Sequence, residues 1–198
     1  MQLRKYTKYL LKNKYLCVIL FSKTRTFFPK AIKEVISMKA LVAYFSASGV
    51  TAKLANKLAA AADSPVYEIR PAQPYTAKDL DWRDKTSRSS VEMNDKSCRP
   101  AISDNDAPVA QADVVFVGFP VWWYREPSVI DTFLEAYDFK GKTIVPFATS
   151  GSSGIGDSGK NMQSVVGKGA KVLEGKRFSA SADENELKKW IKQLEAEL

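Results

Sequence analysis

A short hydroxyl-rich segment, Ser46-Ala47-Ser48-Gly49-Val50-Thr51, follows the apolar run 40–45 and precedes a predicted helix. It offers three hydroxyls and the free backbone N–H groups of a helix start, which together favour an anion such as a phosphate. It holds no Lys or Arg, so it is not a Walker A loop, and a single glycine excludes the G-x-G-x-x-G pattern. The residues predict a phosphate site built without a cation. The alternative is an ordinary helix start that Ser48 or Thr51 caps.

A second segment places three aromatic residues in a row directly after the apolar run 114–119: Pro120-Val121-Trp122-Trp123-Tyr124. Three consecutive aromatic side chains cannot all face one core. On a loop they form flat walls for a planar ring, and each stacked pair adds about 0.5–1.5 kcal/mol beyond burial. The alternative is that one Trp fills the core and the other contacts the surface or a second subunit.

The third segment is rich in hydroxyls and glycines and follows the apolar run 143–148: Thr149-Ser150-Gly151-Ser152-Ser153-Gly154. Glycines allow close backbone approach, and hydroxyls with amides satisfy the polar edge of a heterocycle. The alternative is a flexible connector to the next helix. Because all three segments follow predicted strands, we expect them at one edge of the sheet. A phosphate cradle, an aromatic wall and a polar loop indicate a mononucleotide with a large planar ring.

The elements that position these segments alternate between strands and helices. Continuous apolar runs are typical of parallel strands that helices cover on both faces. Pro146 is awkward inside the run 143–148 because it cannot donate to the ladder. The pattern predicts an α/β fold with a parallel sheet, whose ligands bind at the carboxyl ends of the strands. We expect strands at 40–45, 66–70, 114–119, 143–148 and 171–173, with helices at 51–62, around 129–137, before 171 and around 187–194.

These residues resemble a known family. Residues 40–51 are similar to the flavodoxin signature, a strand that runs into a Ser/Thr-x-Ser/Thr-Gly-x-Thr phosphate loop. Residues 120–123 and 149–154 resemble a flavodoxin-like subgroup with a P-x-W-W segment after the third strand and a Thr/Ser-Gly-x-Ser-Gly loop after the fourth. The resemblance covers 38–198 and implies a doubly wound, five-stranded parallel sheet of order 2-1-3-4-5, with helices on both faces.

The resemblance also implies a cofactor, FMN. It implies that the FMN phosphate is held by Ser46, Ser48, Gly49, Val50 and Thr51. It implies that the isoalloxazine ring is surrounded by Pro120, Val121, Trp122, Trp123, Tyr124, Thr149, Ser150, Gly151, Ser152, Ser153 and Gly154. The chemistry would then lie on the cofactor, with no catalytic protein residue.

Charge is distributed unevenly along the 198 residues. The chain has 30 Lys and Arg against 22 Asp and Glu, a net charge of +8. Residues 1–37 hold nine of the basic residues and one acid, which leaves 21 of each sign for residues 38–198. The apolar run 15–21 is too short to span a bilayer. We therefore expect a basic extension over 1–37, either an amphipathic anchor or a leader upstream of a start at Met38, and a domain over 38–198 with no nucleic-acid partner.

The residue types exclude several kinds of catalysis. The chain has no histidine, which excludes Ser-His-Asp and Cys-His nucleophiles and His-ligated metals. Cys17 and Cys98 form no CxxC motif, so we expect no metal site and a reducing, cytoplasmic location. We expect an FMN-dependent oxidoreductase that uses NAD(P)H to reduce a quinone or similar acceptor. The alternatives are a one-electron carrier that docks redox proteins, although such flavodoxins are usually acidic, and a binding module without flavin. A homodimer stays open.

The segment 71–112 is long for one crossover, and long loops in compact domains are usually functional or disordered. Trp82 and Met93 indicate that it packs against something. We expect a flap beside the flavin or a docking surface, and the alternative is a crossover helix with irregular flanks. Arg125, next to the aromatic run, is expected to be a solvated surface cation rather than a contact for an anionic partner.

Overall fold

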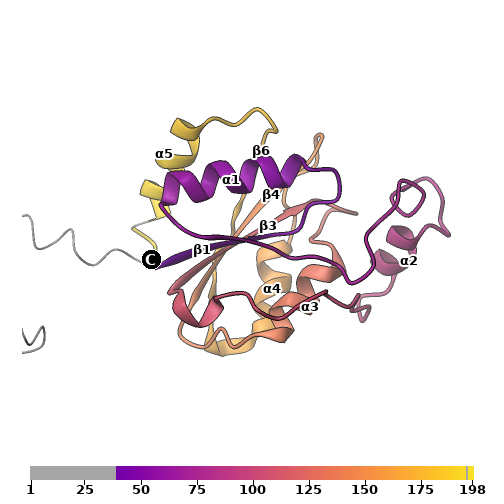
Figure 1. Cartoon of the computed structure of the whole chain (residues 1–198), viewed down its shortest axis with the longest axis horizontal. Helices are drawn as coiled ribbons and strands as arrows, with labels where there is room; N and C mark the ends of the chain where they lie inside the picture. The colour runs from indigo at the N-terminus through magenta and orange to yellow at the C-terminus, as the bar shows by residue number, and fades with distance from the viewer. Residues whose placement is uncertain (1–38, 195) are drawn as a thin grey trace, which may run out of the picture. The chain divides into compact units, whose positions relative to one another are not determined.

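The structure is a computed structural model that describes residues 39–194 and 196–198; the predictions for the extension 1–37 and for a start at Met38 lie outside these residues. A parallel sheet of order β2-β1-β3-β4-β5 forms the centre of the domain, as predicted (Figure 1). The strands are β1 (Ala40–Tyr44), β2 (Val66–Glu68), β3 (Val114–Pro120), β4 (Thr143–Thr149), β5 (Lys171–Val172) and β6 (Lys176–Phe178).

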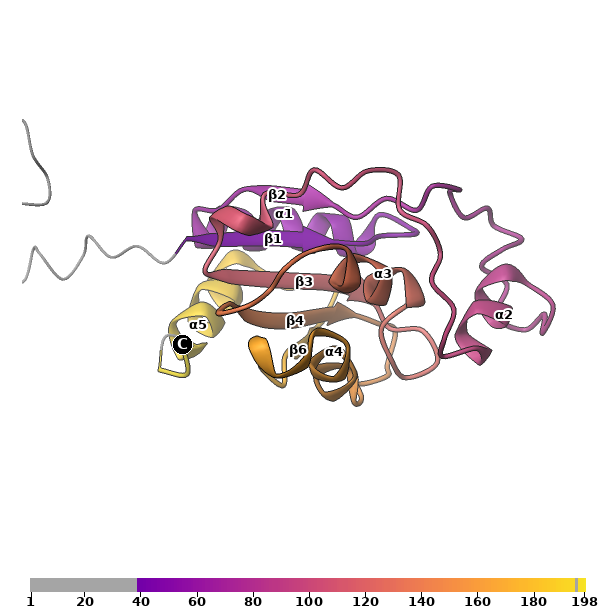
Figure 2. The same ribbon diagram turned by 90° about the horizontal axis from the view of Figure 1, so that it is seen from below.

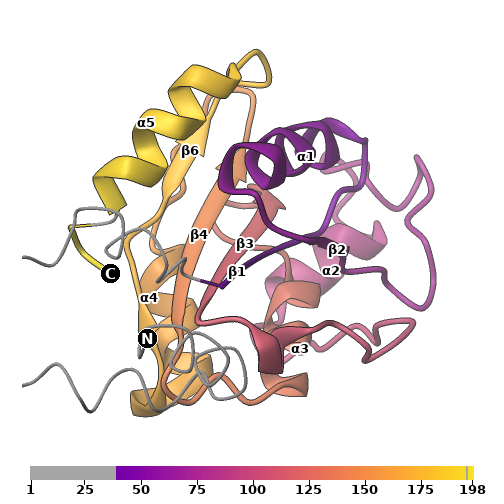
Figure 3. The same ribbon diagram turned by 60° about the vertical axis from the view of Figure 1, so that its left-hand side comes forward.

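Helices cover both faces of the sheet. Helices α1 (Val50–Ala62) and α5 (Glu184–Leu194) lie side by side on one face, and α3 (Ser128–Ala136) and α4 (Ser158–Val166) lie on the other (Figure 3). Successive residues of one strand enter different cores: Val115 packs in the α3–α4 core and Phe116 in the α1–α5 core. The continuous apolar runs follow from this double burial, because side chains alternate across a strand.

The fifth position of the sheet is divided between two strands, which differs from the prediction of a single strand at 171–173. Val172 pairs with Ile144 and Lys176 pairs with Phe147, so the outer strand carries one extra residue opposite Val145–Pro146. The interruption coincides with Pro146, which has no N–H to donate. Gly175 fits there with a φ of 83°, and a Cβ on it would lie 2.5 Å from the Pro146 oxygen. Pro146 is therefore accommodated inside β4 by a break in its neighbour.

The first part of the segment 71–112 projects beyond the carboxyl ends of the strands, and its last part runs back along the sheet toward the start of β3 (Figure 2). The segment contains the short helix α2 (Arg88–Asn94) and a 3₁₀ turn at Val109–Gln111 between irregular stretches, as the crossover alternative predicts. Met93 is buried, but Trp82 is 71% exposed, so the expectation that Trp82 packs against something is wrong.

Candidate functional site

The loop after β1 leads directly into α1 without a side-chain cap. Gly49 is the N-cap residue in the left-handed region (φ 80°), and no side chain bonds to the first amides of the helix. The alternative in which Ser48 or Thr51 caps the helix is therefore wrong. The first N–H groups of a helix have no intrahelical partner, so this end of α1 presents free donors and the positive end of the helix dipole.

Ser46 carries a buried hydroxyl with no hydrogen-bond partner. Leaving such a group unpaired costs about 1–3 kcal/mol, and native proteins rarely do so without a reason. Ser46 lies on the loop that precedes the uncapped helix, and the residue borders a cavity of about 440 Å³. The chemistry of the hydroxyl fits a phosphate oxygen, which would accept the missing hydrogen bond.

Two residues of the predicted site contact each other. The hydroxyls of Thr51 on α1 and Thr149 at the end of β4 lie 2.8 Å apart and are buried. One hydroxyl donates, and the other keeps its own hydrogen for a further partner. Ser48 is exposed, and so is the side chain of Val50, so Val50 could contribute through its backbone. The Thr pair ties the loop after β1 to the loop after β4.

The loop after β4 is ordered by a residue that the sequence did not single out. The Arg177 guanidinium on β6 donates to the Ser150 hydroxyl at 3.2 Å and to the Gly151 carbonyl at 3.4 Å. The Ser150 hydroxyl in turn donates to the Ser153 carbonyl. A Cβ on Gly151 or Gly154 would meet no heavy atom within 4 Å, so both glycines border open space.

The segment after β3 folds into a tight two-residue turn. Trp122 and Arg125 exchange two backbone hydrogen bonds of 3.0 Å each. Trp123 and Tyr124, between them, adopt left-handed conformations with φ of 45° and 64°. For non-glycine residues this costs about 1–3 kcal/mol each, and such strain concentrates at functional sites. The turn directs both aromatic residues outward: Trp123 is 39% exposed and Tyr124 is 75% exposed.

Trp122 packs differently from its two neighbours. Its ring meets Phe45 edge-on at 5.6 Å between centroids and Tyr75 at 5.2 Å. Trp122 is half-buried in this cluster, so the alternative in which one Trp fills the core holds for it in part. Tyr75 belongs to the segment 71–112 and also lines the cavity beside Ser46, which no sequence pattern indicated. The projecting segment therefore adjoins the site.

Arg125 is not a solvated surface cation, which corrects the expectation. Its side chain is 15% exposed and forms ion pairs with Glu126 at 2.9 Å and Asp131 at 2.5 Å, both of them buried. Burial and the neighbouring Glu126 carboxylate raise the pKa of Asp131 to about 6, although Arg125 and Arg99 act in the opposite direction. Arg125 and Asp131 line the same cavity as Trp123 and Tyr124.

The family model of flavodoxin matches residues 39–194. The chain belongs to the flavodoxin family. Among solved structures, candidate flavoproteins from Bacteroides eggerthii DSM 20697 and Bacteroides uniformis ATCC 8492 are each 48% identical to it. They cover 79% and 78% of this chain and 98% of their own, with TM-scores of 0.75 and 0.74. A Lactobacillus acidophilus NCFM flavoprotein in complex with FMN is 23% identical, covers 78% of this chain and 99% of its own, and has a TM-score of 0.58. A search of curated proteins found no match.

The flavodoxin fold brings the three predicted segments to one edge of the sheet. Pro120 and Thr149 are register partners at the ends of β3 and β4, and the Val121 amide donates to the Thr149 carbonyl at 2.9 Å. Among the described residues, no helix is long and apolar enough to cross a membrane. Within the same residues, no group of three or more Cys, Asp or Glu side chains is placed to hold a metal ion.

Proposed function

We propose that this flavodoxin-family chain binds FMN at the loops that follow β1, β3 and β4 and acts as a redox flavoprotein. The observation that carries the proposal is the buried hydroxyl of Ser46, which lacks a partner and stands beside the uncapped start of α1. Hydroxyls, free amides and a helix dipole suit a phosphate monoester without a cation.

The phosphate would be held by Ser46, Ser48, Gly49, Val50 and Thr51. The hydroxyls of Ser46 and Thr51 donate hydrogen bonds, and Val50 contributes its backbone N–H. The left-handed conformation of Gly49 turns the chain so that the amides converge. The Thr51–Thr149 pair fixes this cradle relative to the loop after β4.

The ring would lie between the turn after β3, Pro120 to Tyr124, and the loop after β4, Thr149 to Gly154. Trp123 and Tyr124 offer exposed aromatic faces, and Gly151 and Gly154 border space that no protein atom fills. When bound, FMN supplies the capacity to take up and pass on electrons, and the protein supplies binding, orientation and electrostatics. Arg177 stiffens the loop after β4.

The reaction that we propose is NAD(P)H-linked reduction of a quinone or similar planar acceptor. The exposed aromatic pair beside the ring and the balanced charge of residues 38–198 support a small planar substrate over an acidic docking face. Membership of the flavodoxin family supports the second candidate, a one-electron carrier that docks redox proteins.

Titration of the apoprotein with FMN tests the binding proposal. We expect saturable binding of one FMN per chain with a change in flavin fluorescence, and weaker binding by the Ser46→Ala variant. Absence of saturable binding by the parent protein contradicts the proposal.

Anaerobic mixing of the FMN-loaded protein with NADPH or NADH tests the reaction. We expect the flavin absorption to bleach faster than that of free FMN under the same conditions. A flavin that does not respond to either nucleotide but accepts electrons one at a time from a chemical reductant supports the carrier instead.

A further inference from the structure

The last residue of the turn at 122–125, Arg125, is part of a buried ionic cluster. Arg125 follows the two left-handed residues and donates to Glu126 Oε1 and Asp131 Oδ2 at 2.9 and 2.5 Å. Glu126 adjoins Arg125 in sequence, so that ion pair cannot by itself fix the turn to another element. Asp131 lies in the first part of α3, and its bond to Arg125 connects the turn to that helix.

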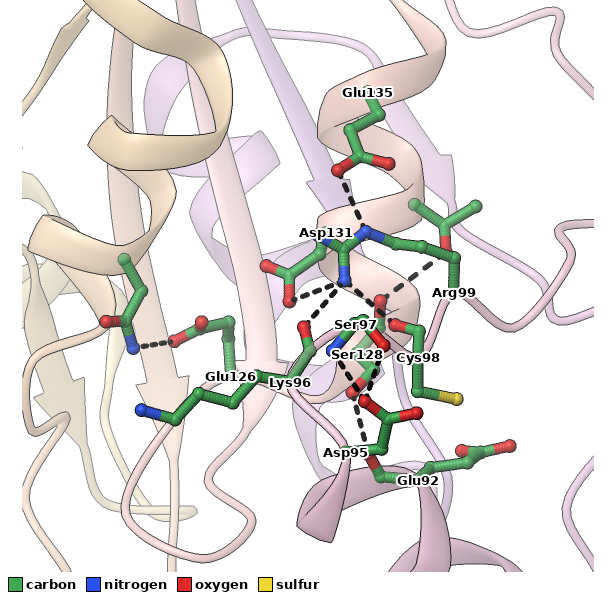
Figure 4. Close-up of polar contacts among 12 residues, drawn as sticks. Glu92, Asp95, Lys96, Ser97, Cys98, Arg99, Glu126, Ser128, Asp131 and Glu135 are labelled. Carbon is green, nitrogen blue, oxygen red and sulfur yellow. Dashed lines mark hydrogen bonds and ion pairs between the residues drawn. The ribbon is translucent and has the colours of Figure 1, made fainter.

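Figure 4 shows Asp131 with its neighbours Arg99 and Glu135. Arg99, from the segment 71–112, lies between Asp131 at 3.9 Å and Glu135 at 2.9 Å, while the Asn161 amide on α4 donates to Glu126 at 3.3 Å. The second oxygen of Asp131, Oδ1, is buried and has no hydrogen-bond partner. Asp131 therefore depends on Arg125 and Arg99 for its stabilising contacts.

A cavity of about 540 Å³ adjoins the cluster, and the charged residues of its lining are Lys96, Arg99, Arg125, Asp131 and Asp157. Arg99 pairs with Asp131 and Glu135, Arg125 pairs with Glu126 and Asp131, and Asp157 at the start of α4 pairs with Lys160 at 2.9 Å. Both guanidinium groups are already paired with carboxylates, so the cluster does not favour an anionic ligand. Its geometry instead favours a role in holding the neighbouring backbone.

We propose that Asp131 is a positioning residue for the strained turn of Trp123 and Tyr124, which it holds through Arg125, and that loss of its charge loosens this turn. The proposal rests on the proposed function in one respect, namely that the turn forms one wall of the flavin site.

The strain of the turn explains why it needs an anchor. Two consecutive non-glycine residues with positive φ persist only where their surroundings fix them. A charge-assisted hydrogen bond between a guanidinium and a carboxylate is roughly twice as strong as a neutral one. If Asp131 is neutral, Arg125 keeps only Glu126, its neighbour in the chain, and the turn loses its direct ionic connection to α3.

The charge of Asp131 is sensitive to moderate acid. Burial and the Glu126 carboxylate raise its pKa to about 6, against the attraction of Arg125 and Arg99. The carboxylate therefore predominates above pH 6, and the turn is held most firmly there. Below pH 6 the neutral acid replaces it, and the same loosening follows without any substitution.

The experiment compares two variants on α3, Asp131→Asn and Glu135→Gln. Each replaces a carboxylate that pairs with Arg99 by a neutral amide of the same shape. Amide hydrogen exchange of the apoprotein is measured at Trp122 and Arg125, the two residues whose backbone bonds close the turn. We expect Asp131→Asn to raise exchange there about tenfold at pH 7.5, with no increase of exchange in β1 and β3. Glu135→Gln should match the parent.

The pH dependence of amide exchange provides a second measurement, and a purely structural role of Asp131 would not change it. After correction for intrinsic rates, we expect parent exchange at Trp122 and Arg125 to rise between pH 7.5 and 5, and Asp131→Asn to stay level. FMN affinity should weaken in acid more for the parent than for Asp131→Asn, because protonation of the FMN phosphate at about pH 6 affects both proteins alike. If Asp131→Asn does not fold, two measurements still test the proposal. One is the pH profile of the parent, and the other is exchange in Arg125→Lys, which removes the guanidinium fork and should also loosen the turn.

Equal exchange in the two α3 variants, or a parent profile without an acid-dependent rise, overturns the proposal. Increased exchange throughout the sheet also overturns it, because it shows that Asp131 supports the fold as a whole. A parent protein that does not bind FMN contradicts the proposed function instead, since the exchange experiment uses the apoprotein and is decided separately.

Discussion

The carbonyl oxygen of Tyr124 lies where a side chain on residue 156 would begin: a Cβ on Gly156 would approach it to 2.1 Å. Gly156 also has a φ of 62°, which favours glycine independently of the contact. The turn after β3 and the chain that precedes α4 are thus fitted to each other through a glycine. Gly156 lies just outside the predicted loop 149–154, and the contact joins two segments of the proposed ring site.

We predict that Gly156→Ala displaces the turn. Overpacking of this kind and the positive φ together should lower the free energy of unfolding by roughly 1–3 kcal/mol, as measured by urea denaturation. FMN binding should weaken, because Trp123 and Tyr124 move. Gly154→Ala is the control for stability, since its Cβ would meet no atom within 4 Å. Equal stability of the two variants would contradict the fitted contact.

Ser46→Ala should change stability and binding in opposite directions. Removal of a buried hydroxyl that lacks a partner relieves a desolvation cost, so the apoprotein should gain up to about 1 kcal/mol. FMN affinity should fall because the phosphate loses a donor. Ser64→Ala is the matched control, since Ser64 also carries a buried hydroxyl without a partner but lies between α1 and β2. A loss of FMN affinity in both variants would argue against a role specific to Ser46.

Local pattern was sufficient to predict the central parallel strands and the three loops at their ends, whereas the strand order came from the family resemblance. The runs 40–45 and 114–119 are apolar because alternate residues fill two cores, and that requirement is visible in sequence. The outer strand, divided into β5 and β6, was harder to predict from the sequence, because only two or three of its residues pair with β4 on each side of the break opposite Pro146.

The contacts that shape the site depend on residues far apart in the chain. Arg125 pairs with Glu126 and Asp131, which are one and six positions away, but Arg99 joins Asp131 from the distant segment 71–112. Tyr75 and Trp122 meet across 47 positions of sequence. Arg177 reaches the loop after β4 from a strand that the sequence did not predict. Local periodicity carries no information on such pairings.

We predict that Tyr75→Ala detaches part of the segment 71–112 from the site. The Tyr75 ring contacts Trp122 and Phe45, and its hydroxyl donates to Glu92 at 2.5 Å. Trypsin should cleave the variant faster than the parent within residues 78–88, which contain several Lys and Arg. Tyr75→Phe keeps the ring contacts and should be cleaved much less readily than Tyr75→Ala. Equal cleavage of both variants would assign the attachment to the hydroxyl and not to the aromatic cluster.

The raised pKa of Asp131 also determines whether its contribution to the free energy of unfolding increases or decreases with pH. In the unfolded chain the carboxyl takes up its proton near pH 3.8, and in the folded protein near pH 6. Between these values the folded state binds more protons, so the contribution of Asp131 to the free energy of unfolding decreases as pH rises. The ionised group that holds the turn therefore lowers the stability of the whole domain, a conflict common at functional sites.

Asp131→Asn should expose this conflict. At pH 4, where Asp131 is neutral in the folded parent, variant and parent should have similar free energies of unfolding. As pH rises to 7, the difference should shift in favour of the variant by up to about 3 kcal/mol, because each pKa unit corresponds to 1.36 kcal/mol. Urea denaturation at four pH values measures the shift, and Glu135→Gln serves as a control without it. A variant that loses stability relative to the parent between pH 4 and 7 would show that the attraction of Arg125 and Arg99 outweighs burial.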